Sequence, residues 1–409
     1  MAFGAHRKEI LSAGVIGACV LVLTFFVIRY PDQTFQASFE GLQLWLRTVL
    51  PALFPFFVIS EILMGIGVIH ALGVMLEPIM RPLFRVPGVG AFALVMGLVS
   101  GNPLGAKITG QLRRDDLCTR EEGERLVAFA NTAGPLFMIG AVAVGMFHDA
   151  SLGLLIVVSH YLAVLLVGLC FRFHGGKSEK TGRRSRTGLR GGLIRRAMQA
   201  MATAHRQDGR PFGRLLSDAI RESMASMIFI GGTIMMFSVL IRILSISGAL
   251  QYAAAALGAF ITLFGVDAEL IAPLTHGIVE MANGAQSISQ ASSELVQRLM
   301  AIGFILGWSG LSVHTQVAAM LYGTDIRFAP YFMARCLHGM VAAALTWLLF
   351  PVLRASENTT VPAIATVIEQ LSYWGQLGVM FGMIAGAVGL LLLLSFVMIV
   401  IRRIHIVRF

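Results

Sequence analysis

An apolar run that is interrupted by polar and helix-breaking residues is the feature that most constrains this chain. Apolar residues lead from Ala91 into Gly97-Leu-Val-Ser-Gly-Asn-Pro-Leu-Gly-Ala-Lys107, where glycines, a proline, an asparagine and a lysine occur together. A plain membrane span would place Asn102 and Lys107 in lipid, and backbone groups freed at such a break must be satisfied by protein or by a water-filled cavity. Short helices that meet at a polar break form the substrate site of many transporters. The stretch therefore predicts a re-entrant hairpin over residues 89–111 that carries a site.

The composition of the chain requires a lipid bilayer. Of its 409 residues 56% are hydrophobic and 13% are charged, and its mean hydropathy is +0.77, whereas soluble proteins have about 25% charged residues. Residues 10–28 are about as long as a full span, and Arg29-Tyr-Pro-Asp32 offers no small-residue cleavage site. We therefore expect an all-α polytopic membrane protein whose first helix is retained and is not a signal peptide.

The basic residues are concentrated in one segment. Between Arg172 and Arg214 there are 12 Lys/Arg and two acidic residues, so the remaining 20 of 32 basic residues balance the remaining 20 of 22 acidic residues. Basic loops stay in the cytoplasm, and such clusters also contact anionic membrane lipids. The segment has few aromatic residues and no recognisable nucleic-acid module, so we expect no nucleic-acid partner. With this loop inside, both the N- and the C-terminus are expected in the cytoplasm.

The sequence contains no signature of an enzyme or of a metal site. Cys19, Cys118, Cys170 and Cys336 are scattered, and no Cys-x-x-Cys or Cys/His ligand spacing occurs. The motifs GxSxG and HExxH are absent from the sequence as well. We expect no enzymatic activity, no metal and no cofactor.

A second interrupted run resembles the first. It reads Gly277-Ile-Val-Glu-Met-Ala-Asn-Gly-Ala-Gln-Ser287, and aligning the two runs brings Asn283 within one position of Asn102. Each run is followed by a stretch that begins with an arginine and ends in a glycine-containing break, Arg125 to Pro135 in the first half and Arg298 to Gly310 in the second. The loop charges predict that the first hairpin opens from inside and the second from outside. Two halves of opposite orientation form the inverted repeat of secondary transporters.

The expected architecture therefore has about eight transmembrane helices and two re-entrant hairpins in an inverted repeat. Spans are expected at residues 10–30, 50–75, 126–147, 151–171, 220–244, 331–353 and 375–401, with one more that begins at residue 298; segments 77–88 and 248–264 are expected at the inner and outer interfaces. The expected domains are an N-terminal helix with an outer amphipathic segment (1–49), the first repeat (50–171), the basic cytoplasmic loop (172–215), the second repeat (216–353), and an outer linker with the C-terminal transmembrane helix (354–409).

The polar residues at the interruptions are candidates for a substrate site. Lys107 would pair with an anionic substrate near a hairpin tip, where half-helix N-termini add positive potential, or it would snorkel to the inner interface. Asn102 would bind a carboxylate or ring nitrogen, or would cap a half-helix. The expected substrate-binding residues are Ser100, Asn102, Lys107, Asn131, Thr132, Asn283, Gln286, Ser287 and Ser309.

Three ionisable residues are candidates for proton or ion coupling. Glu280 lies in an apolar run, and an ionisable group inside a membrane is a functional candidate by default. Its alternative is a residue at the outer mouth, or a buried pair with Arg242 or His276. Glu61, in the second expected span, has the alternative of a helix-packing hydrogen bond. His314 would be either a proton relay or a packing histidine.

Several of these motifs together are similar to those of a known family. The chain contains Ser100-Gly-Asn-Pro-Leu-Gly-Ala-Lys107, Glu124-Arg-Leu, Asn131-Thr-Ala-Gly-Pro-Leu-Phe137, Gly140-Ala-Val and Gly145-Met-Phe147. This combination resembles the YlbJ-type (SpoVV) sporulation integral membrane proteins of endospore-forming bacteria. They belong to the nucleoside-recognition or Gate superfamily, which includes concentrative nucleoside transporters. The resemblance covers residues 40 to 350, about the whole chain except its two ends.

The resemblance implies a transporter that acts during sporulation. It implies a place in the bacterial cell membrane, in the mother-cell-derived outer membrane around the forespore, and a cargo of dipicolinic acid, a small organic anion moved toward the developing spore. The alternatives are a carrier of nucleosides or other small polar solutes, and a non-transporting scaffold that organises other sporulation membrane proteins. Self-association into a homo-oligomer is a further expectation from the relatives.

Overall fold

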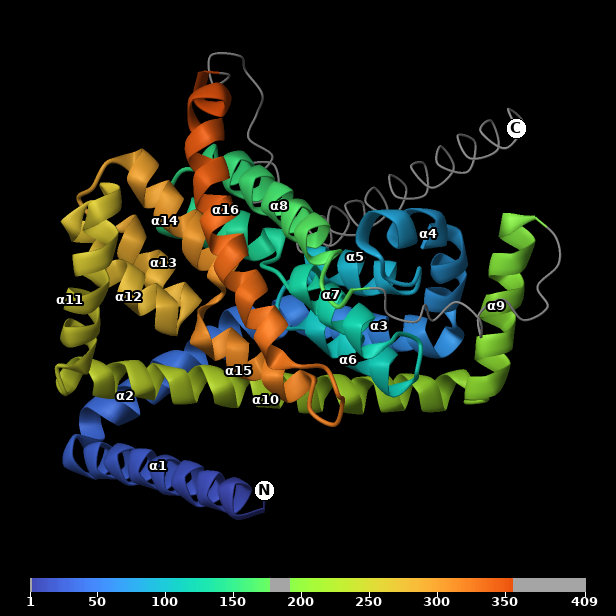
Figure 1. The fold of residues 1–409 in the computed structure, drawn as a ribbon, viewed down its shortest axis with the longest axis horizontal. Coiled ribbons are helices and arrows are strands. Elements are labelled where there is room, and N and C mark those ends of the chain that lie inside the picture. Colours follow the sequence, from blue (N-terminus) through green and yellow to red (C-terminus); the bar gives the residue numbers. More distant parts are fainter. Residues whose placement is uncertain (1, 177–191, 356–409) are drawn as a thin grey trace.

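The computed structural model describes residues 2–176 and 192–355, and every regular element in these residues is a helix (Figure 1). The N-terminal half contains α1 (Ala2–Arg29), α2 (Pro31–Leu44), η1 (Trp45–Val49), α3 (Leu50–Ile66), α4 (Val68–Phe84), α5 (Gly90–Ser100), α6 (Leu104–Arg114), α7 (Arg120–Ala130), η2 (Leu136–Met146) and α8 (Leu152–Phe171). The C-terminal half contains α9 (Leu193–Asp208), α10 (Phe212–Ile246), α11 (Ala249–Ile261), η3 (Thr262–Phe264), η4 (Ala268–Leu270), α12 (Ile271–Val279), α13 (Met281–Ser289), α14 (Leu295–Trp308), α15 (Gly310–Met320) and α16 (Phe328–Ala355).

Several of these helices can cross a membrane. Among the described residues four segments are long and apolar enough, at 152–171, 212–246, 295–320 and 328–351. Two bent pairs of helices, within residues 17–47 and 57–84, raise the number to six if each pair forms one span. The prediction of an all-α protein with several membrane-crossing helices is confirmed. The predicted helix at 375–401, the linker beyond residue 355, the C-terminus and residues 177–191 of the basic loop lie outside the described part of the chain.

The second predicted span ends earlier than expected. The sequence predicted one helix over residues 50–75 and an interfacial segment over 77–88, but α3 ends at Ile66 and α4 leaves it at an angle of 83°. Gly67 causes the bend, because its φ of 87° lies in the left-handed region that glycine adopts without strain. A Cβ on Gly67 would lie 2.7 Å from the carbonyl oxygen of Met201 in α9. The basic helix α9 therefore packs directly against the bend at Gly67.

Two other predicted helices have different bounds in the structure. The stretch 126–147 is interrupted, because α7 ends at Ala130, extended backbone follows at Asn131, and a π-helix (η2) begins after Pro135. A proline disfavours helical backbone in the residue before it, which keeps the two segments separate. The helix predicted at 220–244 runs from Phe212 to Ile246, since its polar first turns continue the helix beyond the apolar run.

The first interrupted run forms two short helices that pack tightly on each other and on α7. A Cβ on Gly97 in α5 or on Gly105 in α6 would overlap the carbonyl oxygen of Ala130, and the two glycines also lie against each other. Thr119 and Glu122 begin α7 with a reciprocal pair of side-chain to backbone hydrogen bonds, at 3.2 and 2.9 Å. Because these two positions carry no side chain, the hairpin can pack directly against the backbone of α7.

The long helix α10 runs along one side of the molecule, with α9 at one end and α11 at the other (Figure 1). α9 packs on α4, α11 packs on α12, and α8, α14 and α16 pack on one another. One hydrophobic cluster, which includes Phe57, Met80 and Phe129, contains residues of each helix from α3 through α7 and residues of α10. A second cluster, which includes Met138 of η2 and Ile302 of α14, is shared by the two halves. The halves therefore fold against each other and not as separate domains.

Candidate functional site

Besides the bends after Arg29 and at Gly67, four interruptions of helices in the described part of the chain fall at polar or glycine-containing positions. The interruptions are Gly101 to Pro103 between α5 and α6, Asn131 to Pro135 between α7 and η2, Glu280 between α12 and α13, and Ser309 between α14 and α15. Backbone groups freed in this way inside a membrane need partners from protein, ligand or water. The position of the four breaks relative to one another therefore decides where a ligand could bind.

The two breaks of the N-terminal half lie against each other. Gly101 has a φ of 88°, and a Cβ on it would lie 2.8 Å from the backbone nitrogen of Gly134. Asn131 Oδ1 accepts a hydrogen bond of 3.3 Å from the backbone N–H of Ala106, in the first turn of α6. The extended segment after α7 thus caps the helix that leaves the first hairpin.

The two breaks of the C-terminal half also meet. Ser309 and Gly310 both have a φ of 74°, and a Cβ on Gly310 would lie 2.8 Å from the backbone nitrogen of Met281. The Trp308 indole N–H donates to the carbonyl oxygen of Ile278 over 2.9 Å. A left-handed conformation is uncommon for a residue other than glycine. At Ser309 it turns the chain from α14 into α15 directly at the break of the second hairpin.

One contact joins the two pairs of breaks. Asn102 Nδ2 donates to Ser309 Oγ over 3.4 Å, and Ser309 Oγ in turn donates to the carbonyl oxygen of Leu306. Two polar atoms beside this contact, Asn102 Oδ1 and Ser100 Oγ, are buried and have no hydrogen-bond partner among the described residues. Buried polar groups in native proteins are nearly always hydrogen-bonded, so such atoms mark a place for a ligand or water.

The helix ends at this junction favour negative charge. α6 begins at Leu104 and α15 begins at Gly310, next to Asn102 and Ser309 respectively. Neither helix has a capping hydrogen bond from the side chain of its own N-cap residue. The first N–H groups of a helix and its dipole attract anions. Two helix N-termini that converge on one contact can therefore hold a carboxylate.

Lys107 and Glu61, which the sequence suggested for separate roles, form an ion pair with each other. Lys107 Nζ lies 2.7 Å from Glu61 Oε1, and the exposed fractions of the two side chains are 11% and 16%. The ammonium also lies 5.0 Å from the centre of the Phe57 ring. Lys107 is therefore neutralised by α3 in this structure, which neither the substrate-binding nor the snorkelling interpretation anticipated.

The structure corrects the register of the second hairpin. The sequence placed Asn283, Gln286 and Ser287 at its polar tip, but the break lies earlier, at Glu280, and all three residues are on α13. Asn283 and Gln286 are exposed, and Ser287 Oγ donates to the carbonyl oxygen of Asn283. Glu280 Oε2 accepts from the backbone N–H of Asn283 over 2.7 Å, so the carboxylate caps α13.

His314, the third candidate for coupling, is a buried side chain with local partners. Its Nδ1 lies 2.8 Å from the carbonyl oxygen of Gly310, and its ring lies 4.2 Å from the Trp308 ring, centre to centre. Its Nε2 has no hydrogen-bond partner among the described residues. The ring therefore packs beside the break between α14 and α15 and keeps one nitrogen free.

The sequence reasoning missed a polar cluster behind the break of α7. Thr132 Oγ1 lies 2.5 Å from His160 Nε2, and the rings of His160 and His338 are 4.5 Å apart. Asn131 Nδ2 donates to the Tyr331 hydroxyl over 3.2 Å. The fully buried Arg335 donates to the carbonyl oxygens of Asn131 and Ala128. An arginine near the start of the predicted span 331–353 was the available signal for this cluster.

Charged residues outside the membrane-spanning segments also join the halves. The buried Glu124 carboxylate accepts from Arg327 Nε over 2.7 Å and from Arg327 Nη2 over 2.9 Å, and His174 Nε2 lies 2.7 Å away. Burial raises the pKa of Glu124, but the hydrogen bonds from Arg327 and His174 outweigh it and hold the pKa below its ordinary value. A second tie runs from Arg113 to Asp325 over 2.8 Å. The loop between α15 and α16 is thereby fastened to α6 and α7.

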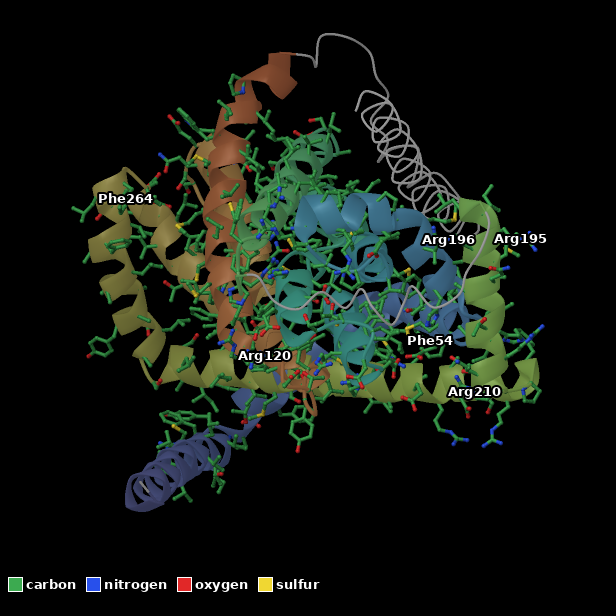
Figure 2. The ribbon with its side chains drawn as sticks, turned by 45° about the vertical axis from the view of Figure 1, so that its right-hand side comes forward. Phe54, Arg120, Arg195, Arg196, Arg210 and Phe264 are labelled. Atoms are coloured by element: carbon green, nitrogen blue, oxygen red, sulfur yellow. The ribbon has the colours of Figure 1, made fainter. Side chains whose placement is uncertain are left out.

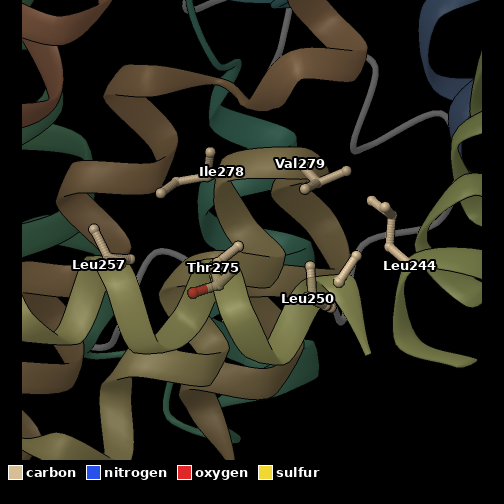
Figure 3. A pocket seen from close by; sticks show the side chains of 8 residues that line it. Leu244, Leu250, Leu257, Thr275, Ile278 and Val279 are labelled. Atoms are coloured by element: carbon tan, nitrogen blue, oxygen red, sulfur yellow. The ribbon is translucent and has the colours of Figure 1, made fainter. Parts of the chain in front are cut away.

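An apolar pocket lies beside the last turn of α12, which ends at the break at Glu280. It has a volume of about 170 Å³ and lies between the end of α10, α11 and α12 (Figure 3). Its lining has one polar side chain, Thr275, and the remaining residues are Leu244, Ala249, Leu250, Ala253, Leu257, Ile278 and Val279. Such a lining suits an acyl chain or a packing helix and not a charged solute.

The described residues offer no metal-ligating cluster. Among them no group of three or more His, Cys, Asp or Glu side chains could hold a metal ion. Cys19, Cys118, Cys170 and Cys336 are all free thiols.

Comparisons with known proteins show the family of the chain. A family model described as Gate, nucleoside recognition, matches residues 46–171. Among solved structures, a double variant of CNTnw in an outward-facing state is similar, with a TM-score of 0.39, 13% identity and coverage of 86% of this chain and 88% of that chain. The sporulation integral membrane protein YlbJ of Bacillus subtilis (strain 168) is 44% identical over 336 residues, which are 82% of either protein. This chain is an integral membrane protein that belongs to the YlbJ family of sporulation proteins.

Proposed function

We propose that this protein is a secondary transporter that carries a small organic anion, dipicolinic acid, across a membrane of the sporulating cell. The observation that carries the proposal is the contact between Asn102 and Ser309, at which four helix breaks and two helix N-termini converge. Transporters of this kind bind substrate at broken helices near the middle of the membrane. The similarity to a sporulation integral membrane protein supports a setting in the sporulating cell. Within that cell we propose the outer membrane around the forespore.

The proposed architecture is an inverted repeat with eight spans and two re-entrant hairpins. The order of elements in the two halves supports it. In the first half, α3 is followed by α4, which is turned away from it, then by the split hairpin of α5 and α6, the interrupted helix α7 with η2, and the long helix α8 (Figure 1). The same order occurs as α10, α11, α12 with α13, α14 with α15, and α16.

The distribution of charge supports an orientation with the basic loop and both termini in the cytoplasm. Arg195, Arg196 and Arg210, on α9 and just before α10, lie at one end of the molecule, and Phe264 lies at the opposite end (Figure 2). Ile194 and Met198 of α9 are exposed beside these arginines. A helix with exposed apolar and basic side chains is suited to the surface of an anionic membrane. We place this end at the cytoplasmic leaflet.

Dipicolinic acid fits the chemistry of the junction. It has two carboxylates and a ring nitrogen, which are all hydrogen-bond acceptors. The N-terminus of α15 supplies N–H donors, and Ser100 Oγ and Asn102 Nδ2 supply side-chain donors beside it. The N-terminus of α6 adds the positive end of its dipole, because its Leu104 and Ala106 N–H groups already donate to other oxygens of the chain. Charge-assisted hydrogen bonds to carboxylates are the strongest of their kind. We therefore propose that one carboxylate lies between the two helix ends.

A second candidate cargo is a nucleoside, because the family model that matches residues 46–171 is described by nucleoside recognition. The two candidates differ in charge. A nucleoside would use the amide and hydroxyl groups at the junction but would gain little from the helix N-termini, which favour anions.

Uptake of labelled dipicolinate into liposomes that contain the purified full-length protein tests the proposal. We expect saturable uptake that unlabelled dipicolinate abolishes and uridine leaves unchanged. Inhibition by uridine, with saturable uptake of labelled uridine, would replace the anion with a nucleoside. No saturable uptake of either solute under a proton or a sodium gradient, by protein that remains folded and monodisperse, would contradict the transporter proposal.

A further inference from the structure

The side chain of a fully buried arginine, Arg335, contacts the C-terminal end of the interrupted helix α7. Arg335 lies in α16, and its side chain is 0% exposed. Nη1 donates to the carbonyl oxygen of Asn131 over 2.8 Å, and Nη2 donates to the carbonyl oxygen of Ala128. No carboxylate of the described residues forms an ion pair with this guanidinium. Its charge is balanced by backbone carbonyls.

The carbonyl groups that Arg335 contacts are those that a helix leaves unpaired. The last four carbonyl groups of a helix have no partner within it, and its C-terminal end carries partial negative charge. α7 ends at Ala130, so Ala128 O belongs to this set and Asn131 O follows it. In secondary transporters, unwound carbonyl groups and half-helix C-terminal ends coordinate the coupling cation. The guanidinium therefore occupies the kind of position in which a transporter binds a soluble cation.

The surroundings hold the arginine in place. The Arg335 guanidinium lies 5.5 Å from the centre of the Tyr331 ring, and the Tyr331 hydroxyl accepts from Asn131 Nδ2. His338 Nε2 lies 3.2 Å from the carbonyl oxygen of His160, which places both rings beside the same break. Arginine presents five N–H donors in a planar fork and keeps its proton in proteins. It is thus a permanent cation whose position is set by α16 and not by the ionic composition of the medium.

The other half of the molecule also fills a helix end with a charge of its own. α13 begins at the break of the second hairpin, and its positive N-terminal end is capped by the buried Glu280, through the backbone N–H of Asn283. The end of α7 and the start of α13 therefore each receive an opposite charge from a side chain of the protein. Neither end requires an ion from solution.

We propose that Arg335 is a resident cation at the break of α7, so that the protein binds no sodium or other small cation at the carbonyl groups of Ala128 and Asn131. The consequence for transport rests on the proposed function: the break of α7 carries a permanent positive charge in the absence of added cations, and an anionic substrate is carried without sodium. Arg335 is a positioning residue, since its side chain has no exposed surface with which to touch a substrate.

Thermal unfolding of the purified full-length protein tests this without any transport assay. For the wild-type protein we expect the same Tm in sodium chloride and in choline chloride of equal ionic strength. Arg335→Ala removes the cation and leaves room for a soluble one. For this variant we expect a lower Tm that methylguanidinium or sodium raises saturably, by a few °C once the ligand is well above its dissociation constant. Arg335→Lys keeps a positively charged side chain, so we expect that neither methylguanidinium nor sodium raises its Tm.

The controls separate a resident cation from a merely structural side chain. Arg221→Ala, at an exposed position of α10, should show no selective response to methylguanidinium. A saturable rise of the wild-type Tm in sodium would overturn the proposal, and this measurement needs no variant to fold. An Arg335→Ala protein that folds but responds to methylguanidinium no more than Arg221→Ala would overturn it too.

In liposomes, sodium-independent dipicolinate uptake supports the proposal, and sodium-dependent uptake contradicts it. A complete lack of uptake contradicts only the transporter function, because the thermal result stands alone.

Discussion

The amide nitrogen of Asn102 lies 3.4 Å from the hydroxyl oxygen of Ser309, and 207 positions of the chain separate these two residues. The contact is long for a hydrogen bond, so it contributes little stability by itself. Its importance is positional, because it joins the break of the first hairpin to the break between α14 and α15. Any movement of one half against the other must change this distance.

Truncating Asn102 should abolish transport without unfolding the protein. Asn102→Ala removes the contact with Ser309 and a donor at the junction, and a lost hydrogen bond of this kind costs about 0.5–1.5 kcal/mol of stability. We expect dipicolinate uptake to fall at least tenfold while Tm changes by a few °C at most. Gln251→Ala, the matched loss of an amide at an exposed position of α11, should leave uptake unchanged. Full uptake by Asn102→Ala would remove the first hairpin from the substrate site.

The ion pair between Lys107 and Glu61 should show strong coupling in a double-mutant cycle. Removing one partner of a fully buried pair leaves an uncompensated charge and costs about 3–5 kcal/mol, whereas removing both is much less costly. The side chains of Lys107 and Glu61 are 11% and 16% exposed, so we expect the same pattern with a smaller cost. Glu61→Gln and Lys107→Met should therefore each lower Tm markedly, and the double variant should recover most of the loss. Tm of the four proteins measures this.

An exposed ion pair provides the control for that cycle. Arg242 Nη2 lies 3.8 Å from Glu40 Oε2, and both side chains are more than one third exposed, at 41% and 54%. Exposed pairs contribute little, so Glu40→Gln and Arg242→Met should be additive in their effect on Tm. Additive effects at Lys107 and Glu61 as well would show that these two side chains do not act as a pair.

A methyl group on the first hairpin should be destabilising. Gly97→Ala places a Cβ on the carbonyl oxygen of Ala130, so the hairpin must move away from α7. Overpacking costs about 1–3 kcal/mol or more, and we expect a lower Tm. Gly232→Ala is the matched control, because Gly232 lies in α10 with nothing within 4 Å of its Cβ position. There, higher helix propensity should stabilise by up to about 1 kcal/mol. Equal effects of the two substitutions would contradict the close packing of the hairpin.

The buried carboxylate of Glu124 should make stability dependent on pH in the acid range. Because the pKa of Glu124 in the folded protein lies below its ordinary value of about 4.3, its ion pairs with Arg327 stabilise the folded state above that pH. This stabilisation is lost as the pH falls through the folded-state pKa. The Tm difference between wild type and Glu124→Gln should therefore be constant near neutral pH and should shrink below about pH 4.

Glu222→Gln, at an exposed position of α10, is the control for the acid range. Its Tm should follow that of the wild type at every pH. A Tm difference for Glu124→Gln that stays constant down to the lowest pH at which the protein folds would show that the contact between Glu124 and Arg327 does not depend on the charge of Glu124.

The sequence by itself was sufficient for the class of protein and for the approximate location of most of the breaks. Hydropathy is a sum over local residues, and glycine and proline disturb a helix through their own backbone, so both can be read from a short window. This is why the all-helical membrane fold and the interruptions at Asn102 and Asn131 followed directly. The break at Glu280 was misplaced by about three residues, because a capping carboxylate inside an apolar run resembles an intramembrane charge.

Only the tertiary structure decided which side chains meet. Lys107 and Glu61 lie on α6 and α3, and Arg335 comes from α16 to the end of α7. Such contacts depend on helix packing between segments that are distant in the chain, and no local pattern records them. Electrostatic pairing needs a specific distance of a few ångströms, whereas hydropathy and helix breaking need none. The sequence alone therefore indicated which stretches are apolar helices and roughly where most of them are interrupted, and the packing of the two halves decided which charges those helix ends receive.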